Sequence, residues 1–312
     1  MRLPGAVARL PYGSEIIFKQ NNQAEELESM NQLAREQKTE SSSEITPAVR
    51  SKVIDYIYSR SGIALGSLTC NFVDTRLRRR LRALQVANGD DYIDYLARQS
   101  DEVEHLVNAF TTNETSFFRT TSLWRYIEDT LLPELAENNT GRSPAFWSAA
   151  CSTGEEPYSL AMLSCNRFPT SKGRPRIFAT DISTEVLEKA SQGIYSGRTI
   201  NRLKKSRSGM LKNYFTQQEN EYQVVDSLRK IVRFEKHNLM QAPAAQEQYD
   251  LVLLRNVLIY FSQPDQIRIL RHITSSIRPG GMLAIGESES LAFFDSGLEF
   301  VKPFLYRKPK RG

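Results

Sequence analysis

The sequence predicts an α/β fold in which a mostly parallel sheet, covered by helices on both faces, follows an all-helical N-terminal domain. In the second half of the 312-residue chain, short apolar runs alternate with helical patterns, which is typical of parallel strands joined by crossover helices. Residues 45–111 instead show helical periodicity without strand-like runs. With 40% hydrophobic and 25% charged residues, the composition is that of a globular protein of one large domain or two ordinary ones.

Charge and cysteine content narrow the kinds of site. The net charge of +5 suits nucleic acid, anionic lipid or an acidic protein as a partner and does not choose among them. Cys70, Cys151 and Cys165 are far apart and share no ligand spacing with the histidines, so we expect neither a disulfide framework nor a metal site. No apolar run approaches the roughly 18 residues of a membrane-spanning helix, and no signal-peptide core is present. We therefore expect a cytoplasmic protein without membrane insertion.

The chain begins with a polar stretch, residues 1–44, which predicts a flexible extension. A helical domain is predicted over residues 45–111. Thr46 is the expected N-cap of its first helix, directly before Pro47. Three further helices are predicted over residues 71–86, 90–99 and 101–110.

The second of these helices carries a cluster of arginines. Its members are Arg76, Arg78, Arg79, Arg80 and Arg82. Such runs usually form a solvated face that pairs with nearby acids, and the alternative is a docking surface for an acidic partner. Nucleic acid is disfavoured, because no aromatic residues are interleaved for stacking and no nucleic-acid-binding motif surrounds the run.

A polar segment, residues 112–119, opens the second predicted domain, which spans residues 112–312. Its pattern alone favours a structural role, with Thr115 or Ser116 capping the next helix. That helix is predicted from about residue 122 to residue 137, with a kink at its proline.

Residues 144–162 predict a buried strand that runs through a tight turn into a helix. Ser152–Gly154 are turn formers, and Pro157 suits the first turn of a helix. Glu155 and Glu156 lie at the positive end of the helix dipole. Two carboxylates at a helix N-terminus argue against a phosphate ligand, so the expected ligand is neutral, cationic or rich in hydroxyls.

A second strand, residues 176–180, ends at Asp181. An acidic residue at this place in a Rossmann-like fold binds ribose hydroxyls. Capping of the following helix is the structural alternative, and the two roles are compatible.

The next segment predicts a small β subdomain inserted at about residues 196–236. Its strands are expected over residues 221–225 and 230–236, paired around a turn. Its basic residues form a second candidate contact surface, or an ordinary solvated one.

The last elements complete the sheet. They are a strand at 249–254, a helix at 263–277, a sharp turn at Pro279–Gly281, a strand at 282–286 and a hairpin within 300–306.

Five sequence stretches, taken together and in their order along the chain, resemble the motifs of one family. They are NETSFFR at 113–119, FWSAACSTGEEPYSLAM at 146–162, ATDISTEVLEKASQGIY at 179–195, LRNVLIYF at 254–261 and PGGMLAIGESESL at 279–291. From about residue 46 to the C-terminus, the chain resembles the CheR family of bacterial chemotaxis receptor glutamate O-methyltransferases. The family often has a small aliphatic residue in place of Glu114 and an alanine in place of Cys151, and neither change removes a matched contact.

The resemblance implies a class I methyltransferase domain that uses S-adenosylmethionine and releases S-adenosylhomocysteine. It implies that the substrate is a set of glutamates on the cytoplasmic helices of chemoreceptors, and we expect a monomer. By motif matching, the residues expected to contact the cofactor are Asn113, Thr115, Arg119, Glu156, Asp181, Asn238, Leu239, Arg255 and Asn256. Arg119 and Tyr260 are the residues expected nearest the reacting centre.

The residues suit this chemistry independently of the resemblance. A glutamate carboxylate has a pKa of about 4.3 and is ionised at neutral pH, so no general base or Cys nucleophile is needed. The remaining task is to align a carboxylate with a sulfonium methyl group. Arg119 would hold the carboxylate or the methionyl end of the cofactor, Tyr260 would donate a hydrogen bond, and Glu156 would face the cationic amino group.

Two other functions fit parts of the pattern. A nucleic-acid methyltransferase is suggested by the positive charge, but the Asn/Asp-Pro-Pro-Tyr motif of the amino-methylating enzymes is missing at residues 255–258. A non-catalytic cofactor-binding protein is the second, and the presence of every matched site residue argues against it. If the chain has the receptor substrate that the resemblance to the CheR family implies, the arginine cluster is the expected docking face for acidic receptor helices.

Overall fold

The computed structural model describes residues 45–65, 70–137, 142–168, 173–243, 248–292 and 294–310. The extension predicted over residues 1–44 lies outside these ranges. Within them, every helix is too short or too polar to span a bilayer.

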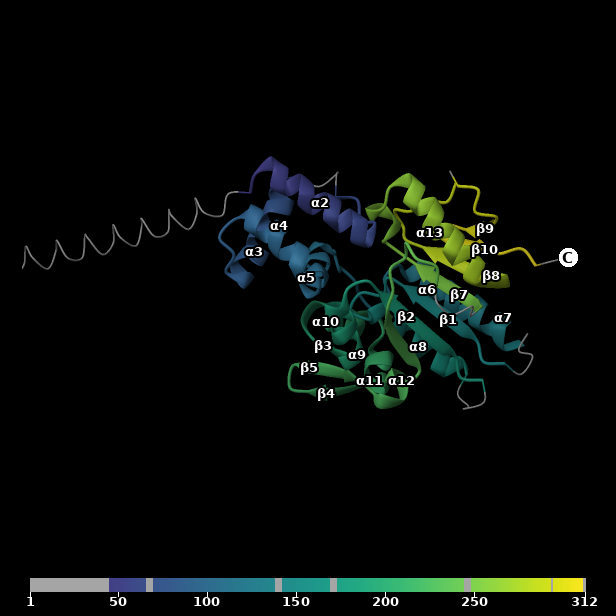
Figure 1. Cartoon of the computed structure of the whole chain (residues 1–312). Coiled ribbons are helices and arrows are strands. Elements are labelled where there is room, and N and C mark those ends of the chain that lie inside the picture. Colours follow the sequence, from purple (N-terminus) through teal and green to yellow (C-terminus); the bar gives the residue numbers. More distant parts are fainter. Residues whose placement is uncertain are drawn as a thin grey trace, which may run out of the picture.

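The described part of the N-terminal domain is a bundle of helices (Figure 1). The helices are α2 (Pro47–Ser61), α3 (Cys70–Leu84), α4 (Gly89–Arg98) and α5 (Ser100–Phe110). The Thr46 hydroxyl accepts a hydrogen bond from the Val49 N–H at 3.2 Å, which confirms the predicted N-cap. Residues at helical spacing, such as Val53 and Ile57 of α2, are fully buried against Leu77 of α3 and its neighbours. The prediction of an all-helical domain is confirmed.

The second domain is built on a seven-stranded sheet in the order β6-β2-β1-β7-β8-β10-β9 (Figure 1). The strands are β1 (Ala145–Ala149), β2 (Arg176–Asp181), β6 (Val232–Lys236), β7 (Tyr249–Leu254), β8 (Ile277–Ile285), β9 (Glu299–Lys302) and β10 (Leu305–Arg307). The first five strands of this order pair in parallel, and β10 is antiparallel to both β8 and β9. The predicted mostly parallel sheet and the C-terminal hairpin are confirmed.

Both faces of the sheet are buried, since successive residues of a strand point to opposite faces and every residue of β1 and β7 is buried. Phe146 of β1 packs with α8 (Glu155–Arg167) on one face, and Trp147 packs with α13 (Gln263–Ser276) on the other. β1 lies between β2 and β7, so the strand order runs outward from it in both directions. A crevice at the carboxyl ends of the strands is expected at such a switch point.

The helix predicted over 122–137 is continuous but uneven. It consists of α6 (Thr121–Tyr126), a π-helical turn η2 (Ile127–Leu131) and α7 (Leu132–Glu137). Pro133 has no N–H to donate to the preceding turn, and the wider turn stands directly before it.

The predicted pairing of residues 221–225 with 230–236 is wrong. β5 (Glu221–Val224) pairs with β4 (Phe215–Gln218) and β3 (Ile194–Tyr195), whereas β6 is the edge strand of the large sheet, parallel to β2. Instead of a turn, α12 (Asp226–Arg229) connects them. In the large sheet, β6 buries Val232 against the main core and packs Phe234 on it, which a hairpin would leave exposed.

The inserted unit therefore comprises the sheet β3-β5-β4 and two helices that precede β4. These helices are α10 (Gly197–Ser206) and α11 (Ser208–Tyr214). The predicted end of the insertion near residue 236 is also wrong, since β6 belongs to the large sheet.

The turn predicted at Pro279–Gly281 lies inside β8, not before it. The Gly280 N–H donates to the Lys308 carbonyl, and the Lys308 N–H donates to the Gly281 carbonyl. These bonds extend the pairing of β8 with β10 toward the start of β8. A shift of register between β7 and β8 accommodates the glycines.

The helical domain packs directly on the sheet domain. The Ala64 N–H donates to the Tyr260 carbonyl at 2.8 Å, and the Asn238 side-chain amide donates to the Arg60 carbonyl at 2.9 Å. Gly62 ends α2 with φ +77°, and a Cβ there would lie 2.5 Å from Cγ of Met240. The segment after α2 is thus held tightly against the carboxyl ends of the strands.

Candidate functional site

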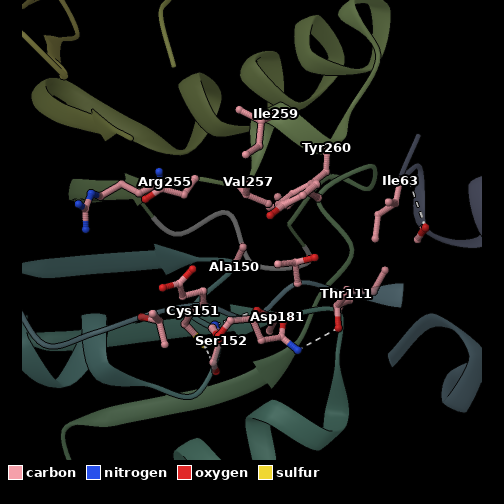
Figure 2. A pocket seen from close by; sticks show the side chains of 18 of the residues that line it. Ile63, Thr111, Ala150, Cys151, Ser152, Asp181, Arg255, Val257, Ile259 and Tyr260 are labelled. Atoms are coloured by element: carbon pink, nitrogen blue, oxygen red, sulfur yellow. Dashed lines mark hydrogen bonds between the residues drawn. The ribbon is translucent and has the colours of Figure 1, made fainter. Parts of the chain in front are cut away.

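A cavity of about 210 Å³ lies at the carboxyl ends of β1, β2 and β7, under the segment that follows α2. All ten residues predicted for cofactor binding and reaction line it. They are Asn113, Thr115, Arg119, Glu156, Asp181, Asn238, Leu239, Arg255, Asn256 and Tyr260. In Figure 2, Ala150 and Asp181 stand on one side of the cavity, Val257 and Tyr260 on the other, and Ile63 of the helical domain beside them.

Asp181 ends β2 with a buried carboxylate. The backbone N–H of Ser152 donates to its Oδ2 at 2.9 Å, and the N–H of Ser183 donates to its Oδ1 at 3.0 Å. Burial raises the pKa of the Asp181 carboxyl, and the backbone N–H groups, that of Ser183 foremost, oppose the rise. The N-cap of α9 (Thr184–Gln192) is Ser183, whose hydroxyl accepts from the Val186 N–H, so the capping alternative for Asp181 is wrong.

Glu156 and Arg255 form a buried ion pair across the cavity floor. Arg255 Nη1 donates to Glu156 Oε2 at 2.8 Å, and the two side chains are 3% and 11% exposed. The Ser148 hydroxyl donates to the other carboxylate oxygen at 2.8 Å. Arg255 Nη2 donates to the Arg119 carbonyl and the Thr120 hydroxyl. Among the described residues, Arg255 Nε has no hydrogen-bond partner.

Arg119 and Tyr260 line the same cavity from different elements. Arg119 follows the polar 113–118 segment, is half-buried, and donates through Nη1 to the Glu114 carbonyl at 3.1 Å. Tyr260 ends the 3₁₀ turn η3 (Leu258–Tyr260), and its ring projects into the cavity (Figure 2).

Left-handed backbone is concentrated in the segments around the cavity. Phe118 and Thr120 have φ of +53° and +69°, Ala150 and Ser152 have +63° and +50°, and Asn256 has +57°. Residues other than glycine rarely adopt this conformation. Such strain is kept where the surrounding contacts enforce it, commonly at functional sites.

Six cavity residues from the helical domain were not predicted. They are Ser61, Ile63, Ala64, Leu65, Phe110 and Thr111. The glycine that follows α2 marks a helix end, but no sequence signal says that the segment beyond it covers the sheet.

Among the described residues, neither an activated thiol nor a metal-binding cluster is found at the cavity. Burial, with the charges of Asp181 and Glu156, raises the pKa of the Cys151 thiol well above its usual value, so the thiolate needed for nucleophilic attack is disfavoured. In the described part of the chain, no three His, Cys, Asp or Glu side chains are grouped to hold a metal ion.

The arginine cluster on α3 separates into two sets. Arg76 donates to the Ala109 and Thr111 carbonyls, and Arg80 Nε donates to Glu102 at 2.9 Å. Both side chains are half-buried and are held by these contacts within the helical domain, and their role in a docking face stays a prediction. Arg78, Arg79 and Arg82 form no ion pair within the described residues.

Residues 51–111 match the family described as "CheR methyltransferase, all-alpha domain", and residues 113–303 match "CheR methyltransferase, SAM binding domain". A "Chemotaxis protein methyltransferase" of Salmonella typhimurium is 37% identical over 250 residues, 77% of this chain and 83% of that protein. The one of Escherichia coli is 36% identical over 253 residues, 78% of this chain and 85% of that protein.

A third relative extends over more of the chain. "Chemotaxis protein methyltransferase 2" of Vibrio cholerae is 33% identical over 267 residues, 83% of this chain and 92% of that protein. The aligned residues make up most of this chain and most of each relative. The chain belongs to the CheR methyltransferase family, and residues 113–303 are its S-adenosylmethionine-binding domain.

Proposed function

We propose that this protein transfers the methyl group of S-adenosylmethionine to glutamate side chains of chemoreceptor cytoplasmic helices. The products are glutamyl methyl esters and S-adenosylhomocysteine. The observation that carries the proposal is the convergence of all ten predicted residues, drawn from distant parts of the chain, on one cavity at the switch point of the sheet. The names of the relatives, chemotaxis protein methyltransferases, agree with a receptor substrate.

The cavity residues fit the cofactor chemically. The Glu156–Arg255 pair offers a carboxylate and a guanidinium within 2.8 Å of each other, which suits the ammonium and carboxylate of an amino-acid group. The unpartnered Nε of Arg255 leaves one buried donor for a ligand. Asp181 is placed to accept hydrogen bonds from ribose hydroxyls. The remaining contacts with the cofactor are assigned to five other residues that line the cavity, Asn113, Thr115, Asn238, Leu239 and Asn256.

When bound, the cofactor supplies an electrophilic methyl group on a sulfonium. The chain's own part is to bring an ionised glutamate to it in line, which is a task of positioning. Arg119 pairs with the incoming carboxylate and Tyr260 donates a hydrogen bond to it. No residue has to remove a proton, because the carboxylate is ionised at neutral pH, well above a pKa of about 4.3.

Transfer to receptor glutamates is measured with radiolabelled cofactor and a purified receptor cytoplasmic fragment. We expect label in the receptor, and loss of that label when its acceptor glutamates are replaced by alanine. Added DNA or RNA is expected to acquire none. Label in the nucleic acid would support the nucleic-acid alternative, and cofactor binding without transfer to any receptor would support a non-catalytic role.

Asp181→Asn is expected to weaken S-adenosylhomocysteine binding by roughly 10- to 100-fold, since hydrogen bonds to a charged group contribute about 1.5–3 kcal/mol. The amide also turns a donor toward one of the two backbone N–H groups that the carboxylate accepts. Calorimetric titration measures the affinity. Asp295→Asn, an exposed change of the same kind, is the control. Equal affinities for the two variants would remove Asp181 from the binding site.

The exposed part of the arginine cluster is proposed to attract acidic receptor helices. Arg79→Glu with Arg82→Glu is expected to raise the KM for receptor severalfold at low salt and less at high salt, because screening weakens such attraction. S-adenosylhomocysteine affinity is expected to stay unchanged. Arg80 is left intact, since its reversal would break the contact with Glu102.

Arg268→Glu with Arg271→Glu, an exposed double reversal on α13 of the sheet domain, controls for net charge. The docking role is contradicted if this control raises the KM as much, or if the effect of the α3 double variant does not depend on salt.

A further inference from the structure

Glu289 is a buried carboxylate just behind the cavity wall. It follows β8 and is 9% exposed. Its Oε2 accepts the N–H of Asn256 at 2.9 Å and the N–H of Gly286 at 2.6 Å. Its Oε1 accepts the N–H groups of Val257 and Leu258, both at 2.8 Å. One side chain thus ties the segment after β7 to the segment after β8.

The neighbouring backbone is shaped to allow this contact. A Cβ on Gly286 would lie 2.6 Å from the Asn256 side-chain nitrogen and 2.7 Å from Glu289 Oε2. Asn256 itself has the left-handed φ of +57°. Glu289 accepts the N–H of this residue and those of the next two, so it stabilises a conformation that the backbone would not otherwise prefer.

The segment held by Glu289 is one wall of the cavity. Arg255, Asn256, Val257 and Tyr260 all line it, whereas Glu289 is not among the lining residues. We propose that Glu289 is a positioning residue: it fixes the 255–260 wall through four backbone N–H groups and thereby sets the affinity for S-adenosylmethionine. This inference rests on the proposed function only in taking that cofactor as the ligand of the cavity.

The test compares Glu289→Gln with Glu287→Gln, which removes an exposed carboxylate two residues away. In Glu289→Gln an amide NH₂ faces two of the four N–H groups, and buried donors left unpaired are costly. We expect at least ~10-fold weaker S-adenosylhomocysteine binding by calorimetry, and at least ~10-fold faster hydrogen exchange at the amides of Val257 and Leu258. The amide of Leu253, inside β7, is expected to keep its protection.

A positioning role also predicts different effects on KM and on kcat. In Glu289→Gln, the KM for S-adenosylmethionine is expected to rise while kcat recovers most of its value at saturating cofactor. Glu287→Gln is expected to match the unaltered protein in all readouts. Unchanged cofactor affinity, or exchange that rises equally along β7 and β8, would overturn the proposal.

Gly286→Ala provides an independent test if Glu289→Gln does not fold. Its Cβ intrudes between Glu289 and Asn256, so the same local loss of protection and of cofactor affinity is expected. Retained affinity in a folded Gly286→Ala protein would also overturn the proposal. Exchange and cofactor binding need no receptor, so these results stand even if receptor glutamates prove not to be the substrate.

Discussion

Arg119→Ala is expected to lower the rate of methyl transfer by at least ~100-fold, the loss typical when a reacting group is no longer aligned. The guanidinium lines the cavity and donates to the Glu114 carbonyl, while the residue's backbone carbonyl accepts from Arg255 and Trp124. Truncating the side chain leaves those backbone contacts in place. The fold is therefore expected to persist, with circular dichroism and the unfolding midpoint near those of the unaltered protein.

The matched control is Arg125→Ala, an exposed arginine on α6. Its turnover with labelled cofactor is expected to equal that of the unaltered protein. Unchanged turnover in Arg119→Ala would remove Arg119 from the reacting centre.

Arg255→Met is expected to have the largest combined effect. It leaves Glu156 as a buried carboxylate without its cation, and breaking a buried pair in this way costs about 3–5 kcal/mol. Cofactor binding is expected to be lost as well, since the pair lines the cavity. Urea unfolding measures the first effect and calorimetry with S-adenosylhomocysteine the second.

The double variant Glu156→Gln with Arg255→Met separates stability from binding. Removing both charges is expected to restore most of the stability without restoring cofactor affinity. Arg50→Met breaks a comparable pair, Arg50–Asp74 in the helical domain, with Nε to Oδ1 at 2.7 Å. It is expected to destabilise the protein while its folded fraction still binds cofactor. Full cofactor affinity in the double variant would contradict the role of the pair.

The sheet and the position of Asp181 at its edge were predictable from local patterns, whereas Arg255 and most other site residues were predicted only from the resemblance to the CheR family. β1, β2 and β7 are continuous apolar runs, and parallel strands place their carboxyl ends at one edge. Asp181 and Arg255 each stand at the end of such a run, so they lie close together although 74 residues separate them in the numbering. The role of residues 113–119 in the site was predicted only from the resemblance to the CheR family, since the pattern of this segment alone favoured a structural role.

The features that the sequence patterns did not reveal depend on contacts between distant segments of the chain. β6 follows β5 closely in the sequence but pairs with β2, where Val232 is buried in the main core and Phe234 packs against it. Arg80 looks like its neighbours in the sequence, and only the packing of α5 against α3 brings Glu102 to it. The lining provided by Ile63 depends on how the two domains dock, which neither periodicity nor composition encodes.

The methyl acceptor is the central question, and alkaline treatment of labelled receptor answers it most directly. A glutamyl methyl ester hydrolyses in base, so the account predicts that the label is released as volatile methanol and that mass spectrometry of untreated peptides places it on glutamate. Base-stable label, or label on any other kind of side chain, would contradict it.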